Sequence, residues 1–144
     1  MSNRTLTYLS IAVVACIGLL LVINLIPSIQ GISSGKYLQL NDVRGSAVQH
    51  KGLLYTLNFD QQNHLVDWLN HSVAVKSDSY KKDPDMEIEK IVVYLFNKPD
   101  LEIEPIAYSN GNLVFSSPKW NASGLFIDTS NGVLKQMLSE TYDH

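Results

Sequence analysis

The stretch IEKIVVYLF, residues 88–96, carries the strongest strand signal in the part of the chain that follows residue 27. Its second half combines β-branched and aromatic residues and is apolar on both faces. Such a run is typical of a strand that is covered on both sides. We therefore expect residues 88–96 to lie centrally in a sheet.

Shorter strand signals lie upstream, at residues 43–49 and 53–57. The polar residues 50–52 between them favour a tight turn, so we expect an antiparallel hairpin. Residues 72–75 form a possible further short strand. The polar run 76–85 is expected to be an exposed loop.

A helix is expected between the hairpin and that loop. Asn58 and Gln61 have the spacing of a capping box, in which the two side chains satisfy the main-chain donors of a helix start. We expect this helix to run to about residue 71. Three apolar side chains share one face of it, which should pack on the sheet: Leu65, Trp68 and Leu69.

Downstream, residues 97–100 turn the chain, and residues 106–108 and 113–115 flank Asn110-Gly111. An Asn-Gly pair favours the type I′ turn of a hairpin, because both turn residues must accept a positive φ. Residues 124–127 can add another strand. Ser130 can cap a last helix whose apolar stripe is Val133, Leu134, Met137 and Leu138.

The expected order is thus β-β-α-β-β-β-β-α, an α+β fold with a small, largely antiparallel sheet and two packed helices. The 117 residues beyond Pro27 are enough for one domain of ordinary size. Ten basic and fourteen acidic residues give this part a formal charge of −4. No basic face is expected to attract phosphates, so nucleic acid is not an expected partner.

An uncharged apolar run, YLSIAVVACIGLLLVINLI, occupies residues 8–26 and is followed by Pro27. A helix of ~20 apolar residues crosses the ~30 Å hydrocarbon core of a bilayer. We therefore predict a single transmembrane anchor in residues 8–27, after a tail in 1–7 and before a Ser- and Gly-rich stalk in 28–36 and a soluble domain in 37–144. The residues assigned to the membrane anchor include Tyr8, Ile11, Val14, Leu19, Leu21 and Ile26.

Two alternatives to this anchor are a cleaved secretory signal and a lipoprotein signal ending at Cys16. The apolar run is longer than the ~7–15 residues of a signal core, and the chain stays apolar for ten residues after Cys16. Ala12 and Cys16 are four residues apart, a spacing of small side chains that lets transmembrane helices pack closely. An ordinary lipid-facing helix remains the alternative for this pair.

The orientation of the anchor is read from the basic residues at its ends. Arg4 precedes the run, whereas Lys36 and Arg44 follow it at greater distance. By the positive-inside tendency we predict a cytoplasmic N-terminus and an extracytoplasmic C-terminal domain.

Acidic residues recur with a period of two in residues 83–89 and 100–104. A calcium loop is not predicted, because Ile88 and Tyr94 occupy the positions where that loop requires glycine and glutamate. The alternation instead indicates solvent-facing positions of strand ends. A functional alternative is an acidic patch that contacts a basic partner: Glu87, Glu89, Glu102 and Glu104.

No pattern in the sequence predicts a catalytic, metal or cofactor site. His64 and His71 lie seven apart on the expected helix, without a metal-binding spacing such as H-x-x-x-H. Ser116 and Lys119 have the S-x-x-K spacing of penicillin-recognising enzymes, but that family's companion elements are missing.

We therefore predict a non-catalytic, membrane-anchored protein-interaction module or small accessory subunit of a membrane-embedded complex, without cofactors. The alternative is a membrane-tethered domain that binds a small ligand or a lipid. That alternative requires a pocket between the sheet and the helix at residues 58–71.

Overall fold

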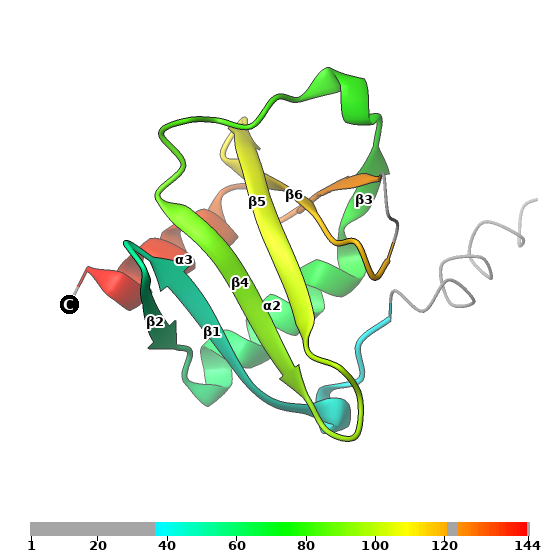
Figure 1. The fold of residues 1–144 in the computed structure, drawn as a ribbon, viewed down its shortest axis with the longest axis vertical. Coiled ribbons are helices and arrows are strands. Elements are labelled where there is room, and N and C mark those ends of the chain that lie inside the picture. The colour runs from blue at the N-terminus through cyan, green and yellow to red at the C-terminus, as the bar shows by residue number, and fades with distance from the viewer. Residues whose placement is uncertain (1–36, 121–123, 144) are drawn as a thin grey trace, which may run out of the picture. The chain divides into compact units, whose positions relative to one another are not determined.

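The computed structural model describes residues 37–120 and 124–143. From Leu38 onward these residues form one compact unit, an α+β fold with a seven-stranded antiparallel sheet and two α-helices (Figure 1). The strands are β1 (Val43–His50), β2 (Leu53–Thr56), β3 (Val73–Val75), β4 (Ile88–Leu95), β5 (Leu101–Ser109), β6 (Asn112–Ser116) and β7 (Leu125–Ile127). The helices are α2 (Phe59–His71) and α3 (Val133–Tyr142), and two 3-10 turns are η1 (Leu40–Asp42) and η2 (Ser77–Ser79).

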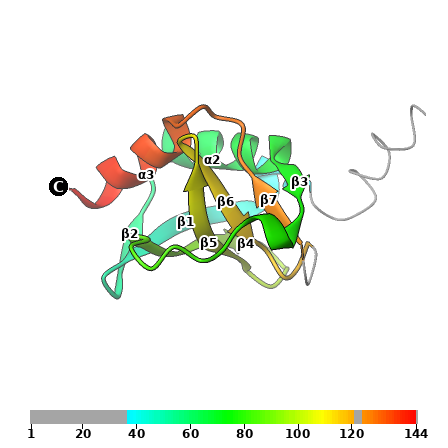
Figure 2. The same cartoon turned by 90° about the horizontal axis from the view of Figure 1, so that it is seen from above.

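The strand order across the sheet is β2-β1-β4-β5-β6-β7-β3, and every neighbouring pair is antiparallel. Both helices lie on the same face of the sheet (Figure 2). The core fills the space between these layers, with Leu65 and Leu69 from α2 and Leu134 and Leu138 from α3 all fully buried. The α+β class predicted from the sequence is confirmed.

The strand predicted at residues 88–96 is β4, which lies inside the sheet between β1 and β5. Ile91 and Val93 are fully buried on the helix side. The fourth of the seven strands, however, is β5. The prediction for that strand, residues 106–108, was too short by six residues.

β5 begins early because its first half alternates buried and exposed residues: Leu101 and Ile103 are buried, whereas Glu102 and Glu104 are exposed. Its first three residues pair with β4, and the strand then continues along β6 past a bulge. Pro105 lies just beyond the part of β5 that pairs with β4. Its missing N–H therefore does not interrupt that ladder.

The start of α2 is confirmed as a capping box. The N–H of Gln61 donates to Asn58 Oδ1 and the N–H of Asn58 donates to Gln61 Oε1, both at 2.9 Å. Trp68 is only half-buried but packs against the core. The predicted inward face of this helix is thus also confirmed.

The turn at Asn110-Gly111 has positive φ at both residues, as the prediction requires. Gly111 also lies beside a second Asn-Gly pair, since a Cβ added to it would make an ordinary contact of 3.5 Å with the Cα of Gly132. Gly132, with φ +88°, occupies the N-cap position of α3. Two left-handed glycines therefore join the β5–β6 turn to the start of the last helix.

Ser130 is not the N-cap residue of α3, which is Gly132. Its Oγ nevertheless accepts a hydrogen bond from the N–H of Leu134 at 2.9 Å, so it satisfies a main-chain donor of the first turn, as a cap would. The predicted apolar stripe of α3 is correct for Leu134, Met137 and Leu138, which are buried. Val133 was wrongly included, as it is half exposed. It is the first residue of α3 and stays exposed although the next residue, Leu134, is fully buried.

Neither helix in residues 37–120 and 124–143 is long and apolar enough to cross a membrane. The tail, anchor and stalk predicted from the sequence lie in residues 1–36, outside the described residues. This includes the six residues assigned to the membrane anchor and the Ala12–Cys16 pair.

Candidate interaction surface

The face of the sheet opposite the helices carries charged side chains from β4 and β5. The register places Val92 of β4 opposite Glu102 of β5. Lys90 is two residues before Val92 in β4 and is therefore the diagonal neighbour of Glu102. Its Nζ lies 3.3 Å from Glu102 Oε2, so an ion pair joins the two strands across their outer face. The Glu102 side chain is 62% exposed, which leaves its carboxylate open to other partners.

The next glutamate along β5 pairs with the long loop between β3 and β4. Glu104 forms an ion pair and hydrogen bond with Lys82 of this loop. The loop is held at this place by its main chain, because the N–H of Asp83 donates to the carbonyl of Ile106 at 2.7 Å. The loop therefore places Lys82 beside β5, where its exposed ammonium group is a counter-charge to Glu104.

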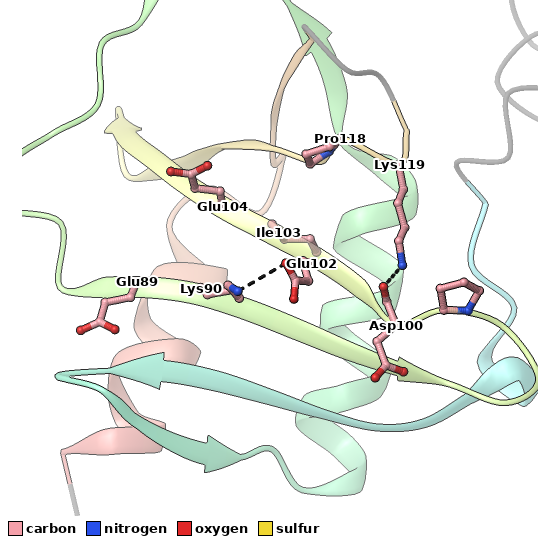
Figure 3. Close-up of a pocket in the computed structure, with 9 residues that line it drawn as sticks. Glu89, Lys90, Asp100, Glu102, Ile103, Glu104, Pro118 and Lys119 are labelled. Atoms are coloured by element: carbon pink, nitrogen blue, oxygen red, sulfur yellow. Dashed lines mark hydrogen bonds and ion pairs between the residues drawn. The ribbon is translucent and has the colours of Figure 1, made fainter.

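These charges surround a cavity of about 590 Å³ on the outer face (Figure 3). Figure 3 looks onto β4 and β5 with α2 behind them. The cavity is lined by Glu89, Lys90, Pro99, Asp100, Glu102, Ile103, Glu104, Pro118 and Lys119. Its wall is thus mixed in charge, with carboxylates in excess over ammonium groups.

Asp100 shapes one end of this cavity. Its Oδ1 accepts a hydrogen bond from the N–H of Leu95 at 3.0 Å, which holds the turn between β4 and β5. The same oxygen lies 3.6 Å from the guanidinium of Arg44. The main-chain carbonyl of Asp100 accepts a hydrogen bond from Lys119 Nζ. Asp100 therefore joins the loop after β6 to the turn.

The structure brings three of the four glutamates of the predicted acidic patch together. Glu89, Glu102 and Glu104 line the cavity. Glu87 does not line it, and its carboxylate instead accepts a hydrogen bond from the hydroxyl of Tyr142 at 3.1 Å. The Oε1 of Glu89 also accepts the N–H of Gly52 at 3.0 Å.

Glu87 belongs to a separate polar and aromatic cluster at the end of α3. His50 Nδ1 donates to the carbonyl of Glu87 at 2.7 Å, since a carbonyl can only accept. The rings of His50 and Tyr142 stack with centroids 4.1 Å apart. Burial and the hydrogen bond to Glu87 raise the pKa of the Tyr142 hydroxyl above its usual value. Burial, followed by the charges of Glu87 and Asp128, raises the pKa of Tyr108 to about 12.

The two histidines of α2 have local partners. His64 stacks on Trp68 with centroids 5.5 Å apart, and His71 lies 3.3 Å from Asp67. Among the residues described here, no group of three or more His, Cys, Asp or Glu is arranged to hold a metal ion.

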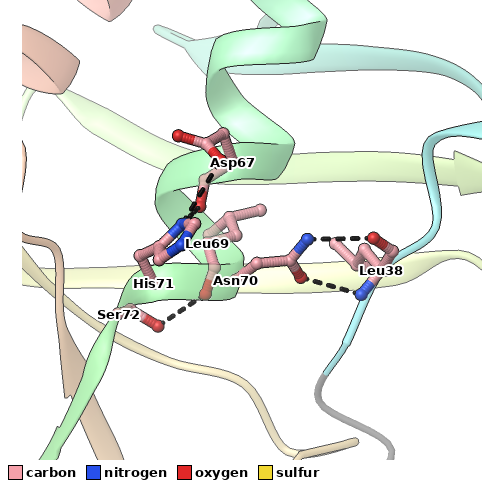
Figure 4. A network of polar contacts seen from close by, with 6 residues as sticks. All are labelled: Leu38, Asp67, Leu69, Asn70, His71 and Ser72. Atoms are coloured by element: carbon pink, nitrogen blue, oxygen red, sulfur yellow. Dashed lines mark hydrogen bonds and ion pairs between the residues drawn. The ribbon is translucent and has the colours of Figure 1, made fainter. Parts of the chain in front are cut away.

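The end of α2 binds the chain where it enters the domain (Figure 4). Asn70 Oδ1 accepts the N–H of Leu38 at 2.8 Å, and Asn70 Nδ2 donates to the carbonyl of Leu38 at 2.9 Å. Ser72 Oγ donates to the carbonyl of Leu69 at 2.7 Å and closes the helix. No local sequence pattern predicts this contact, because it joins residues that are distant along the chain.

Sequence reasoning also missed the lysines of the charged face. Lys82 and Lys90 meet the glutamates only through loop position and strand register, which no local pattern reveals. Exposed ion pairs of this kind contribute little to stability, about 0–1 kcal/mol each, so their charges remain available for binding.

In the comparisons with known proteins, no family model matches the chain, and neither a curated protein nor a solved structure matches it.

Proposed function

We propose that this chain is a non-catalytic protein-interaction module, anchored to a membrane by residues 8–27 and acting as an accessory subunit of a membrane-embedded complex. The observation that carries the proposal is the charged outer face of β4 and β5, where Glu102 and Glu104 remain 62% and 49% exposed beside the cavity. The uncharged run of residues 8–26 supports the anchor.

The partner that fits this face carries cationic side chains. Glu102 and Glu104 already bind Lys90 and Lys82 in exposed pairs. Because water screens these pairs, an incoming Arg or Lys can replace or join an existing lysine at small cost. The cavity gives such a side chain a place to enter.

Copurification of the full-length chain from its own membranes tests the proposal. The tagged protein is mildly crosslinked, purified, and its companions are identified by mass spectrometry. A stoichiometric set of membrane proteins is the expected result. If the chain is recovered without companions, the accessory-subunit proposal is wrong.

A matched pair of variants tests the charged face itself. Glu102→Gln with Glu104→Gln removes two negative charges from the outer face. Asp67→Asn with Asp78→Asn removes the same charge from exposed positions on α2 and η2. We expect only the first pair to reduce copurification, and an equal effect of both pairs would exclude this face as the contact.

Binding of a small ligand or lipid remains the second proposal. Its favourable observation is the volume of the cavity, which lies in the ~300–1,000 Å³ range of small-molecule sites. The cavity is on the outer face, however, whereas the sequence-based hypothesis required a pocket beneath α2. That side of α2 is filled by the buried Leu65 and Leu69. Native mass spectrometry of the purified chain tests for a bound molecule.

A further inference from the structure

β2 is an edge strand of the sheet, and its main chain has a defined inner and outer side. The N–H of Leu57 donates to the carbonyl of Ser46 at 3.0 Å, which continues the register between β2 and β1. Hydrogen-bonded and non-hydrogen-bonded residues alternate along an antiparallel pair. The main-chain groups of Tyr55 therefore point toward β1, and those of Leu54 and Thr56 point away from it.

Nothing in the described part of the chain binds these outward groups of Leu54 and Thr56. Edge strands are usually protected by charged residues, proline or a bulge. β2 has the sequence LLYT and contains none of these three devices, so its short length of four residues is the one protective feature of this strand. Leu53 and Leu54 are 61% and 57% exposed along the same edge.

We propose that β2 pairs with β2 of a second copy of this chain. The two strands run antiparallel, with Leu54 of each copy opposite Thr56 of the other. The two sheets then form one continuous sheet across a twofold axis that passes by Tyr55. This inference rests on the main chain of β2 and is independent of the predicted anchor.

The register follows from which main-chain donors are already used. The N–H of Gly52 donates to Glu89 Oε1 at 3.0 Å, and the N–H of Asn58 donates to Gln61 Oε1 at 2.9 Å. Pairing Leu54 with Thr56 satisfies every free group on this edge. A register shift of two residues in either direction would place Leu54 or Thr56 opposite Asn58 or Gly52, whose main-chain N–H groups already donate to side chains.

Charge and apolar surface also favour a second copy as the occupant. The strand itself is uncharged, while Lys51 precedes it and Asp60 follows it. Antiparallel pairing brings the Lys51 end of one strand to the Asp60 end of the other on both sides of the axis. It also brings the exposed Leu53 toward Phe59 of the second copy, which is 69% exposed.

Disulfide crosslinking of the full-length chain tests this register. Cys16→Ser removes the single native cysteine, and two differently tagged forms carrying Leu54→Cys or Thr56→Cys are coexpressed and oxidised. Directly opposite residues lie about 5.5 Å apart, within the ~4.4–6.8 Å that a disulfide spans, whereas diagonal neighbours lie about 7–8 Å apart. We expect the mixed disulfide to be the main product.

The control replaces Thr56→Cys by Val73→Cys, an exposed position on the opposite edge strand β3. Equal yields of the mixed and same-variant disulfides, or an equal yield with Val73→Cys, would overturn the proposal.

A second experiment measures the dimer dissociation constant of the purified full-length chain in detergent by analytical ultracentrifugation. Thr56→Pro removes an outward N–H and leaves the hydrogen bonds to β1 in place, as proline is tolerated on sheet edges. Thr56→Val keeps that N–H. We expect Thr56→Pro to weaken dimerisation by about tenfold or more and Thr56→Val to leave it unchanged. Equal dimerisation of the two variants, with equal thermal midpoints, would contradict the pairing.

Discussion

Asn70 holds both main-chain groups of Leu38, as a neighbouring strand would hold them. The contact joins the C-terminal turn of α2 to the residue at which the chain enters the domain. Leu38 itself is buried in the core, so the amide fixes the main chain while the side chain packs. Through this contact, the main chain of Leu38 is tied to α2.

Replacing Asn70 should therefore loosen the N-terminal edge of the domain. Asn70→Asp keeps the size of the side chain but loses the donor to the Leu38 carbonyl. We expect it to lower the free energy of unfolding by about 1–3 kcal/mol, the cost of a part-buried group left without its partner. Urea denaturation measures this change. Asn97→Asp at an exposed turn is the control and should change stability by less than about 0.5 kcal/mol.

Asp128 should contribute more to stability than any carboxylate of the charged face. It is 1% exposed, and its two oxygens accept the N–H groups of Ser130 and Leu113. Asp128→Ala leaves both donors unsatisfied beside β6, and we expect a loss of about 2–4 kcal/mol in urea denaturation. The exposed Glu102→Ala is the comparison, with an expected loss below about 1 kcal/mol. Similar losses for the two variants would contradict this account of Asp128.

The left-handed conformation of Gly132 predicts a difference among glycine substitutions. Gly132 has φ +88°, so Gly132→Ala should cost about 1–2 kcal/mol through backbone strain. At Gly45 a Cβ would make an ordinary 3.5 Å contact with the Tyr94 ring, and no positive φ is involved. Gly45→Ala should therefore be nearly neutral. Thermal unfolding of both variants checks the comparison, and an equal loss would show that conformation at residue 132 is not the cause.

The raised pKa values of Tyr108 and Tyr142 predict weaker stability in alkali. Between pH 10 and about 12 the unfolded chain releases tyrosine protons that the folded chain retains. The free energy of unfolding is therefore unaffected by these groups below pH 10 and decreases as the pH rises through this window. Tyr108→Phe should make the decrease shallower in urea titrations at pH 9, 10 and 11. Tyr37→Phe is the control, because Tyr37 is 62% exposed.

Local sequence patterns were sufficient for the elements whose residues specify them directly. Two such elements are the capping box at Asn58 and Gln61 and the turn at Asn110-Gly111. Each is specified by residues no more than three positions apart in the sequence. The first half of β5 was missed because its alternating glutamates were interpreted as strand ends instead of the outer face of an interior strand. The full length of β5 follows only from its pairing with β4, in which the buried Ile91 lies opposite Ile103.

The candidate surface was predicted only in part for a similar reason. The alternation of acidic residues predicted Glu89, Glu102 and Glu104 correctly, but it does not distinguish them from Glu87. An irregularity in the pairing of β1 with β4 and the hydrogen bond from Tyr142 place Glu87 at the end of α3, away from the cavity. The pairing of Lys90 with Glu102 depends on the register between two strands. Register is decided by the burial of whole strands and is not readable at single residues.

The strand order has a consequence for how fast the domain folds. The β1–β2 hairpin and the β4–β5–β6 meander join segments that are close along the chain, and short loops close quickly. β1 reaches β4, and β3 reaches β7, only across long intervening segments. The formation of these two distant strand pairs is therefore expected to limit the folding rate. Substitutions at the β1–β4 contact should slow refolding more than substitutions within either local unit.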